Sequence, residues 1–266
     1  MNTVAAHVAL VPGGVLPGEL AYGPLLAALG RDAEPLVKDL ELYAGDTPPA
    51  GYTLDHEVEG IRRAVDERGF QTFHLVGYSA GGAACLAFVA RYPERVRSLA
   101  LIEPAWIGNN DLSPEEVEDW RELDRMIALP PEEMMREFVS SGTPPGAASP
   151  EPAPGPPPPW MAKRPAGLRA LIQAFKAFEL DHARLREFDG PVYLALGTLS
   201  IPVEERKIER LGRIFANAEI DRYEGRHHFD PPHRAEADRF AGALQRLWSR
   251  SGTADAIEPS ANVALR

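Results

Sequence analysis

A serine set between glycines, Ser79, is the residue of this sequence that is best placed to act as a nucleophile. It lies in the run 77–82 (Gly-Tyr-Ser-Ala-Gly-Gly), directly after the apolar segment 73–76 and before the small-residue run 83–90. A strand that turns sharply into a helix strains its corner residue and needs glycine where side chains would collide. The serine oxygen then stands beside a helix N-terminus, whose free N–H groups favour developing negative charge. The alternative is a glycine-rich turn with a solvent-facing serine.

A serine hydroxyl is a weak nucleophile unless a base accepts its proton. The chain has seven histidines, and two of them, His227 and His228, lie in the run 224–229 that follows the last predicted strand. A loop at the carboxyl end of that strand can reach a serine at the same edge of a sheet. We expect His228 to be the base, with His227 as the alternative, and we interpret His7 and His74, on predicted strands, as structural.

Acyl transfer also needs hydrogen-bond donors for the oxyanion. One is expected to be the amide of Ala80, which follows the nucleophile at the start of its helix. The second should come from the loop at 11–15 (Val-Pro-Gly-Gly-Val), where a glycine pair lets the backbone approach a substrate closely. The amide of Gly14 is our candidate, and a simple tight turn is the alternative reading of the pair.

Short apolar strands alternate with helical segments along most of the chain. Strands are predicted at residues 7–11, 35–39, 73–76, 96–103, 192–196 and 218–223. Helices are predicted at residues 19–29, 54–68, 80–90 and 234–246. Continuous apolar strands between helices predict an α/β fold, with a mostly parallel sheet of about six strands covered by helices on both faces. Ligands bind such sheets at the carboxyl ends of the strands.

The alternation stops between residues 108 and 188, which we interpret as a helical cap over the strand ends. Ser113, with Glu116 three residues later, is typical of the start of a helix within this segment. Nine prolines between residues 144 and 159 predict an extended loop. An inert linker is the alternative for that loop. Residues 1–107 and 189–249 would form the core, and 250–266 a disordered tail.

Three aromatic side chains are expected at the substrate pocket, namely Tyr78, Trp106 and Trp160. Methionines and a phenylalanine of the cap suggest an apolar, adaptable surface beside them; these are Met126, Met134, Met135 and Phe138. For each cap aromatic taken alone, ordinary packing is an equally good reading.

Composition limits the other functions open to the chain. Its 266 residues suit one large α/β domain or two small ones, and a net charge of −11 argues against nucleic acid or an anionic membrane as the main partner. The single cysteine, Cys85, cannot form an internal disulfide and is expected to pack. Without a basic, apolar leader or a run of ~18 apolar residues, the expected location is the cytoplasm. The sequence leaves the oligomeric state open.

Together these motifs resemble the α/β-hydrolase superfamily over about residues 6–248. The specific parts are the serine turn at 77–82 and the histidine loop at 225–229, while 12–14 (Pro-Gly-Gly) is similar to the family's His-Gly-x oxyanion loop. The chain starts at what resembles the third family strand. The resemblance therefore implies that the usual N-terminal hairpin is missing.

The position of the acid departs from the family pattern. Members often carry an aspartate after the strand that precedes the last one, where this chain has Ser200. Glu103, at the end of the strand at 96–103, is our expected acid, as in certain haloalkane dehalogenases that resemble this arrangement. The alternatives are Glu204 or Glu205, or a dyad without an acid.

The resulting hypothesis is a serine hydrolase that cleaves a carboxylic ester, thioester or lactone of a small, largely apolar substrate. Serine at the turn excludes the aspartyl-ester chemistry of the dehalogenase and epoxide hydrolase branches. The same residues could cleave a C–C bond or an amide, or support cofactor-free oxygen chemistry. A ligand-binding protein of this fold without turnover is the alternative from another class. No metal-ligand spacing or phosphate-binding glycine loop is visible in the sequence, so no metal or cofactor is expected.

Overall fold

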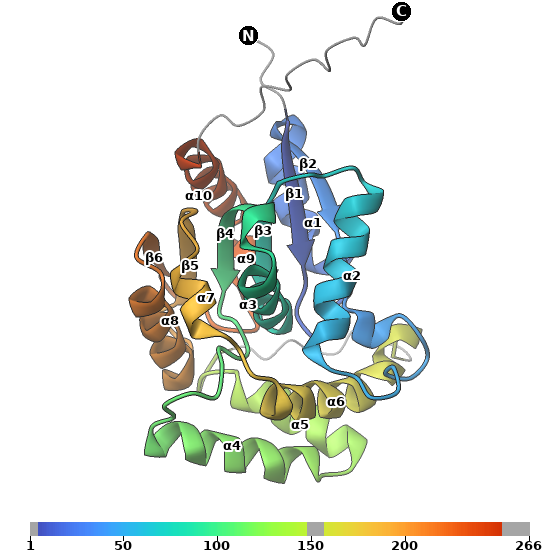
Figure 1. Ribbon diagram of the computed structural model, residues 1–266. Helices are drawn as coiled ribbons and strands as arrows, with labels where there is room; N and C mark the ends of the chain where they lie inside the picture. Colours follow the sequence, from blue (N-terminus) through green and yellow to red (C-terminus); the bar gives the residue numbers. More distant parts are fainter. Residues whose placement is uncertain (1–4, 148–156, 252–266) are drawn as a thin grey trace, which may run out of the picture.

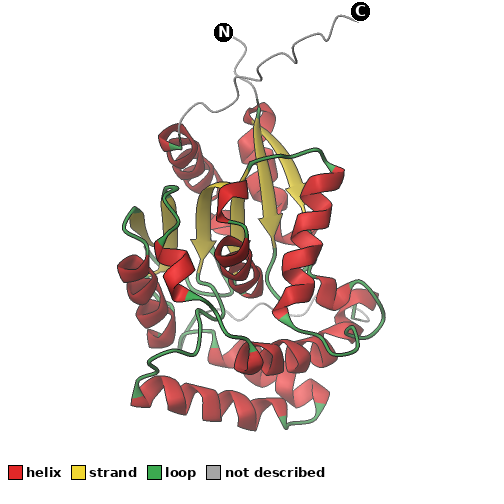
Figure 2. Cartoon of the chain, in the orientation of Figure 1, coloured by secondary structure: helices red, strands yellow, loops and turns green. Residues whose placement is uncertain are grey.

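A six-stranded sheet, in which all strands run parallel, forms the centre of the molecule (Figure 2). The computed structural model describes residues 5–147 and 157–251. The sheet order is β2-β1-β3-β4-β5-β6. The strands are β1 (Ala6–Val11), β2 (Ala33–Val37), β3 (Phe73–Tyr78), β4 (Val96–Ile102), β5 (Val192–Gly197) and β6 (Ala218–Tyr223). The predicted parallel sheet of about six strands is confirmed.

Helices cover both faces of the sheet, because successive strand residues point to opposite sides. On one face, Leu75 and Leu99 belong to a core shared with α2 (Leu54–Glu67), α3 (Ala80–Arg91) and α8 (Pro202–Ile214). On the other, Val76 and Ala100 pack in a core shared with α1 (Gly18–Leu29) and α10 (Ala237–Arg250). This double burial is why the strands read as continuous apolar runs.

Two predicted elements differ from the observed ones in a way that has a physical reason. The closing helix, expected as one segment, is divided into α9 (Pro232–Ala235) and α10 by Glu236, whose backbone (φ −130°, ψ 47°) is not helical. The second strand lies slightly earlier than expected, and its Pro35 is opposite Val8. Proline is tolerated there because β2 is an edge strand.

The segment between β4 and β5 carries α4 (Pro114–Ile127), α5 (Pro131–Ser141), α6 (Arg164–Ala177) and α7 (His182–Arg186). Figure 1 shows α4, α5 and α6 gathered at the end of the sheet toward which the strand arrows point. These three helices share a small apolar cluster that includes Met126, Met134, Leu168 and Ile172. Much of the predicted proline loop, and nearly all of the predicted tail, lies outside the described residues.

The close packing of α3 on β1 leads to a prediction about stability. A Cβ on Gly81 would lie 2.1 Å from the carbonyl oxygen of Val11 and 2.5 Å from that of Pro12. Because both contacts are backbone, we expect Gly81→Ala to lower the free energy of unfolding by about 2 kcal/mol or more, measured by urea denaturation. Gly23→Ala is the control, because a Cβ on Gly23 would have no heavy atom within 4 Å. This variant replaces a glycine within α1 by alanine, so it should not lower the free energy of unfolding. Equal stability of Gly81→Ala and the wild type would contradict the prediction.

Candidate active site

Ser79 occupies the sharp turn between β3 and α3. Its backbone has φ 52° and ψ −118°, a region that non-glycine residues rarely adopt. The neighbouring chain holds this conformation in place, because the Ser79 amide donates to the carbonyl of Ile102 at 3.0 Å and the Ser79 carbonyl accepts from Ala105 at 2.9 Å. The strained serine turn that the glycine pattern predicts is therefore present.

His228 is the histidine that the structure brings to this serine. It follows β6, and its Nε2 lies 3.1 Å from Oγ of Ser79. The hydroxyl of Tyr78 donates to the backbone carbonyl of His228 and so ties the histidine loop to the serine turn. His227 makes a different contact, since its Nδ1 accepts from the amide of Phe229.

Glu103 lies on the other side of the imidazole. Its Oε2 is 3.0 Å from Nδ1 of His228, and the side chain is almost completely buried. Its Oε1 accepts from the amide of Gly197 at 2.7 Å and from the hydroxyl of Ser200. Ser200, which stands where the family pattern expects an aspartate, is thus a hydrogen-bond donor to the carboxylate on the neighbouring strand. Glu103 directly follows β4, and its backbone has a positive φ of 41°.

The surroundings favour opposite charges on this pair. Burial opposes a charged Glu103, yet the hydrogen bonds from His228, Ser200 and Gly197 hold the pKa of its carboxyl below the usual value. Burial also opposes a protonated His228, but Glu103 and the more distant Glu204 raise the pKa of its imidazole above the usual value. The imidazole is therefore a stronger base than a free histidine side chain.

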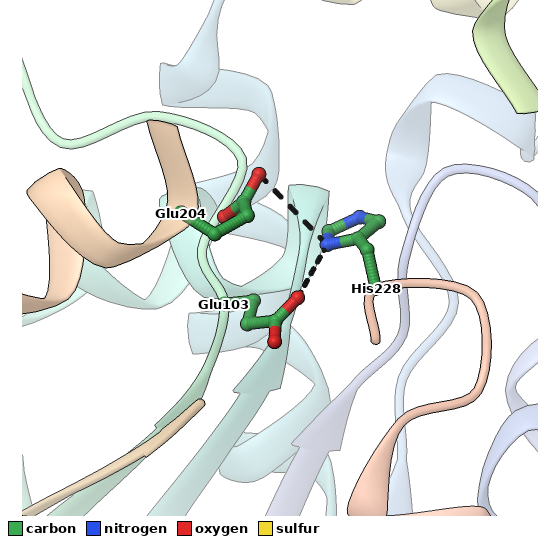
Figure 3. A group of neighbouring side chains, drawn as sticks. All are labelled: Glu103, Glu204 and His228. Atoms are coloured by element: carbon green, nitrogen blue, oxygen red, sulfur yellow. Dashed lines mark hydrogen bonds and ion pairs between the residues drawn. The ribbon is translucent and has the colours of Figure 1, made fainter. Parts of the chain in front are cut away.

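A second carboxylate, Glu204, lies close to the same nitrogen (Figure 3). Its Oε1 is 3.9 Å from Nδ1 of His228, and its other oxygen is 2.8 Å from the buried ammonium of Lys207. Lys207 also donates to the carbonyls of Pro104 and Ala105, at 2.8 and 3.3 Å. The ion pair on α8 thus fixes the chain just after Glu103.

The sequence interpretation missed Lys207. The available signal was its spacing of three residues from Glu204, which places the two side chains on one side of a helix. Glu205, the other alternative acid, is exposed and pairs with Arg222.

Among the acidic, histidine and cysteine side chains of residues 5–147 and 157–251, one group is compact enough to hold a metal ion: Glu103, Glu204 and His228. The contacts of these donors fit a different arrangement. Nδ1 already faces Glu103 at hydrogen-bond distance, and Lys207 already supplies a positive charge to Glu204. The group therefore fits an imidazole whose Nδ1 faces two carboxylates, one of which is paired with an ammonium.

The position of Glu204 predicts the pH dependence of any reaction that uses His228 as its base. Only the neutral imidazole accepts a proton, so activity rises with pH through the pKa of His228. Because the charge of Glu204 raises that pKa, Glu204→Gln should move the acidic limb of kcat/KM to lower pH by about 1 unit. Glu205→Gln, one residue away and exposed, should leave the limb in place. An unshifted limb in Glu204→Gln would contradict this prediction.

The two expected oxyanion donors belong to residues that lie close together. Gly14 and Ala80 line the same cavity as Ser79, and a Cβ on Gly14 would be 3.7 Å from the Cβ of Ala80. Ala80 is the first residue of α3. The hydroxyl of Tyr43 donates to the carbonyl of Gly14 at 2.8 Å, which fixes the orientation of this loop.

A cavity of about 580 Å³ opens above Ser79, between the sheet edge and the helices α4–α6. Its walls are mainly apolar and include Trp106, Trp120 and Phe175. The rings of Trp106 and Phe175 stack with their centres 5.5 Å apart, so the wall joins the core to α6. The space suits a small, largely apolar ligand.

The three expected pocket aromatics have different positions. Trp106 lines the cavity, whereas Tyr78 and Trp160 are not among its lining residues within the described chain. Tyr78 supports the histidine loop, and Trp160 lies 5.3 Å from the guanidinium of Arg164. His74, interpreted above as structural, contacts the hydroxyl of Ser98, and the Nε2 of His182 lies within hydrogen-bond distance of the carbonyl of Ile107.

Comparison with known proteins supports the fold described above. A family model of the alpha/beta hydrolase fold matches residues 12–149. The 2-hydroxy-6-oxo-6-phenylhexa-2,4-dienoate hydrolase of Comamonas testosteroni is 33% identical over 79 residues, which are 30% of this chain and 28% of that enzyme. A thermophilic esterase of Thermogutta terrifontis superposes with a TM-score of 0.71 at 18% identity, covering 94% of this chain and 92% of the esterase. For the naproxen esterase of Bacillus subtilis, the TM-score is 0.65 at 16% identity, with 92% and 84% covered.

The chain belongs to the alpha/beta hydrolase family, since the family model spans more than half of its length. It covers only 28% of the length of the dienoate hydrolase, and the two esterases share its fold. No helix within the described ranges combines the length and the apolar character needed to cross a membrane.

Proposed function

We propose that this protein is a serine hydrolase that cleaves a carboxylic ester, thioester or lactone of a small, largely apolar substrate through an acyl-enzyme on Ser79. The observation that carries the proposal is the continuous row from Ser79 Oγ through His228 to Glu103, with contacts of 3.1 and 3.0 Å. In such a row, the base accepts the proton of the nucleophile while the acid holds the imidazole in the required tautomer.

The first half of the reaction forms the acyl-enzyme. Ser79 Oγ attacks the carbonyl carbon of the substrate while Nε2 of His228 takes the hydroxyl proton. The amides of Gly14 and Ala80 donate to the resulting oxyanion, and Glu103 stabilises the imidazolium. The tetrahedral intermediate then collapses, and His228 returns the proton to the leaving group.

The second half of the reaction hydrolyses the acyl-enzyme and releases the carboxylic acid product. His228 takes a proton from a water molecule, whose oxygen attacks the acyl carbon, and the proton then returns to Ser79 Oγ. Trp106 forms part of the wall against the substrate. Tyr78 contributes through its hydrogen bond to the backbone of His228, which holds the base in reach of the nucleophile.

Labelling by a fluorophosphonate tests the nucleophile directly. The wild type should gain the mass of one phosphonyl group on intact-protein mass spectrometry, and peptide mapping should place it on Ser79. The His228→Ala variant should react much more slowly, because the hydroxyl then lacks its base. A wild type that remains unlabelled, or that is labelled elsewhere, would overturn the proposal.

A second candidate is hydrolysis of a C–C bond by the same residues. The observation that favours it is the match to the dienoate hydrolase of Comamonas testosteroni, whose substrate carries a carboxylate, as its name states. A panel that includes 4-nitrophenyl esters and a dienoate substrate separates the two candidates.

A further inference from the structure

The cavity above Ser79 is lined by more acidic than basic side chains. The bases among its lining residues, apart from His228, are Arg125 and Lys207. The acidic residues that line it are Glu116, Asp119, Glu122, Glu137 and Glu204. The other described residues of the wall are uncharged, so Arg125 and Lys207 are the cationic groups that could pair with a negatively charged substrate group.

Lys207 has no proton left to offer. An ammonium carries three donors, and those of Lys207 are engaged by the carboxylate of Glu204 and by the carbonyls of Pro104 and Ala105. A substrate carboxylate would have to displace one of these buried contacts. Such a displacement would leave a polar group unpaired beside the reacting atoms, which is costly.

Arg125 already pairs with acidic side chains of its own helix, and its side chain is exposed to solvent. Its Nη2 lies 3.1 Å from Glu118 and 3.8 Å from Glu122, and its side chain is 65% exposed. It therefore belongs to a surface ion-pair group on α4 and supplies little positive charge to the interior of the cavity.

The acids are only partly neutralised. Glu116 pairs with Arg210, and Asp119 pairs with Arg206. Glu137 on α5 has no ion pair with any described residue. Glu137 is exposed and lines the cavity, so it contributes negative charge at the solvent-facing edge of the wall.

We propose that this site selects substrates by charge: it accepts esters whose groups inside the cavity are uncharged, and it rejects esters that carry a carboxylate there. The inference rests on the proposed function. Burial of a carboxylate without a cationic partner is unfavourable, and the surrounding acids add repulsion. The same selection disfavours the second candidate reaction, whose substrate is a carboxylate.

Two substrates that differ in one charge test the selection. They are the 4-nitrophenyl monoester of adipic acid and the diester in which the second carboxyl group is capped by methyl. They share the leaving group and the acyl chain, and each enzymatic rate is divided by the rate of hydroxide-catalysed hydrolysis of the same ester. At neutral pH we expect kcat/KM for the capped ester to exceed that for the monoester by about tenfold or more.

Substitutions on α5 test whether the exposed edge of the cavity contributes to the preference for the capped ester over the anionic monoester. Glu137→Gln should raise kcat/KM for the anionic monoester relative to the capped ester by about twofold to fivefold. Glu132→Gln, on the same helix but outside the cavity lining, should leave the ratio unchanged.

Failure of the charge selection and failure of the proposed function give different results. A ratio of capped ester to monoester below about tenfold, with hydrolysis of both still lost in Ser79→Ala, overturns the selection and leaves the serine hydrolase intact. An absence of Ser79-dependent hydrolysis with either ester, together with no phosphonyl label on Ser79, overturns both.

Discussion

Replacing Ser79 with alanine is expected to lower kcat for ester hydrolysis by about 10⁴-fold or more, because the variant has no oxygen to form the acyl-enzyme. The residual rate should come from substrate binding and from the oxyanion donors alone. The free energy of unfolding should change by about 1 kcal/mol or less, since the substitution removes one side-chain hydrogen bond. Steady-state kinetics and urea denaturation measure the two quantities.

Ser249→Ala is the matched control for this variant. Ser249 lies on the exposed side of α10, and its hydroxyl bonds only its own helix, at the carbonyl of Arg246. Its kcat should equal that of the wild type. Substantial turnover in Ser79→Ala, with the fold intact, would show that another group carries the chemistry.

Glu103→Gln has the second largest expected effect, a fall in kcat of about 10⁴-fold. The amide oxygen can still accept from Gly197 and Ser200, so the amide nitrogen is left to face Nδ1 of His228. That nitrogen donates, which forces Nδ1 to be the acceptor and puts the ring proton on Nε2. Nε2 then faces Ser79 as a donor and cannot take its proton. A kcat near that of the wild type would contradict the assignment of Glu103 as the acid.

The same variant should change how stability depends on pH. The pKa of Glu103 is lowered on folding, so its contribution is present above the unfolded pKa and is lost as pH falls through the folded value. The pKa of His228 is raised, so its contribution is present below the unfolded pKa and is lost as pH rises through the folded value. The free-energy difference between wild type and Glu103→Gln should therefore be largest between about pH 4.5 and 6.5.

The features that local chemistry dictates were predictable from the sequence. A strained strand-to-helix turn needs glycines at fixed positions around its corner residue. The glycines around Ser79 therefore predict that it occupies such a turn. Parallel strands place their carboxyl ends at one edge, so His228 and Glu103 could be placed beside it although they are far apart in the chain. Because Ser200 stands at the usual acid position, the carboxylate at the end of the strand at 96–103 is the expected alternative.

Other features depend on how helices dock, which a single sequence does not specify. Lys207 reaches Pro104 only because α8 packs against the chain after β4. The sequence predicts Trp160 and Trp106 alike as pocket residues. The packing of the segment before α6 places the Trp160 ring next to the guanidinium of Arg164. The break at Glu236 is likewise a backbone adjustment within a helical pattern.

The hydrogen bond from Tyr78 to the backbone of His228 joins residues 150 positions apart, and this separation matters during synthesis. A nascent chain that ends after β4 already carries Ser79 and Glu103, the proposed nucleophile and acid, but it lacks the imidazole proposed to activate the serine. Under the proposed mechanism, the Ser79 hydroxyl therefore stays unreactive until the histidine loop has left the ribosome. Under the proposed mechanism, the chain becomes competent for hydrolysis only after synthesis has passed residue 228.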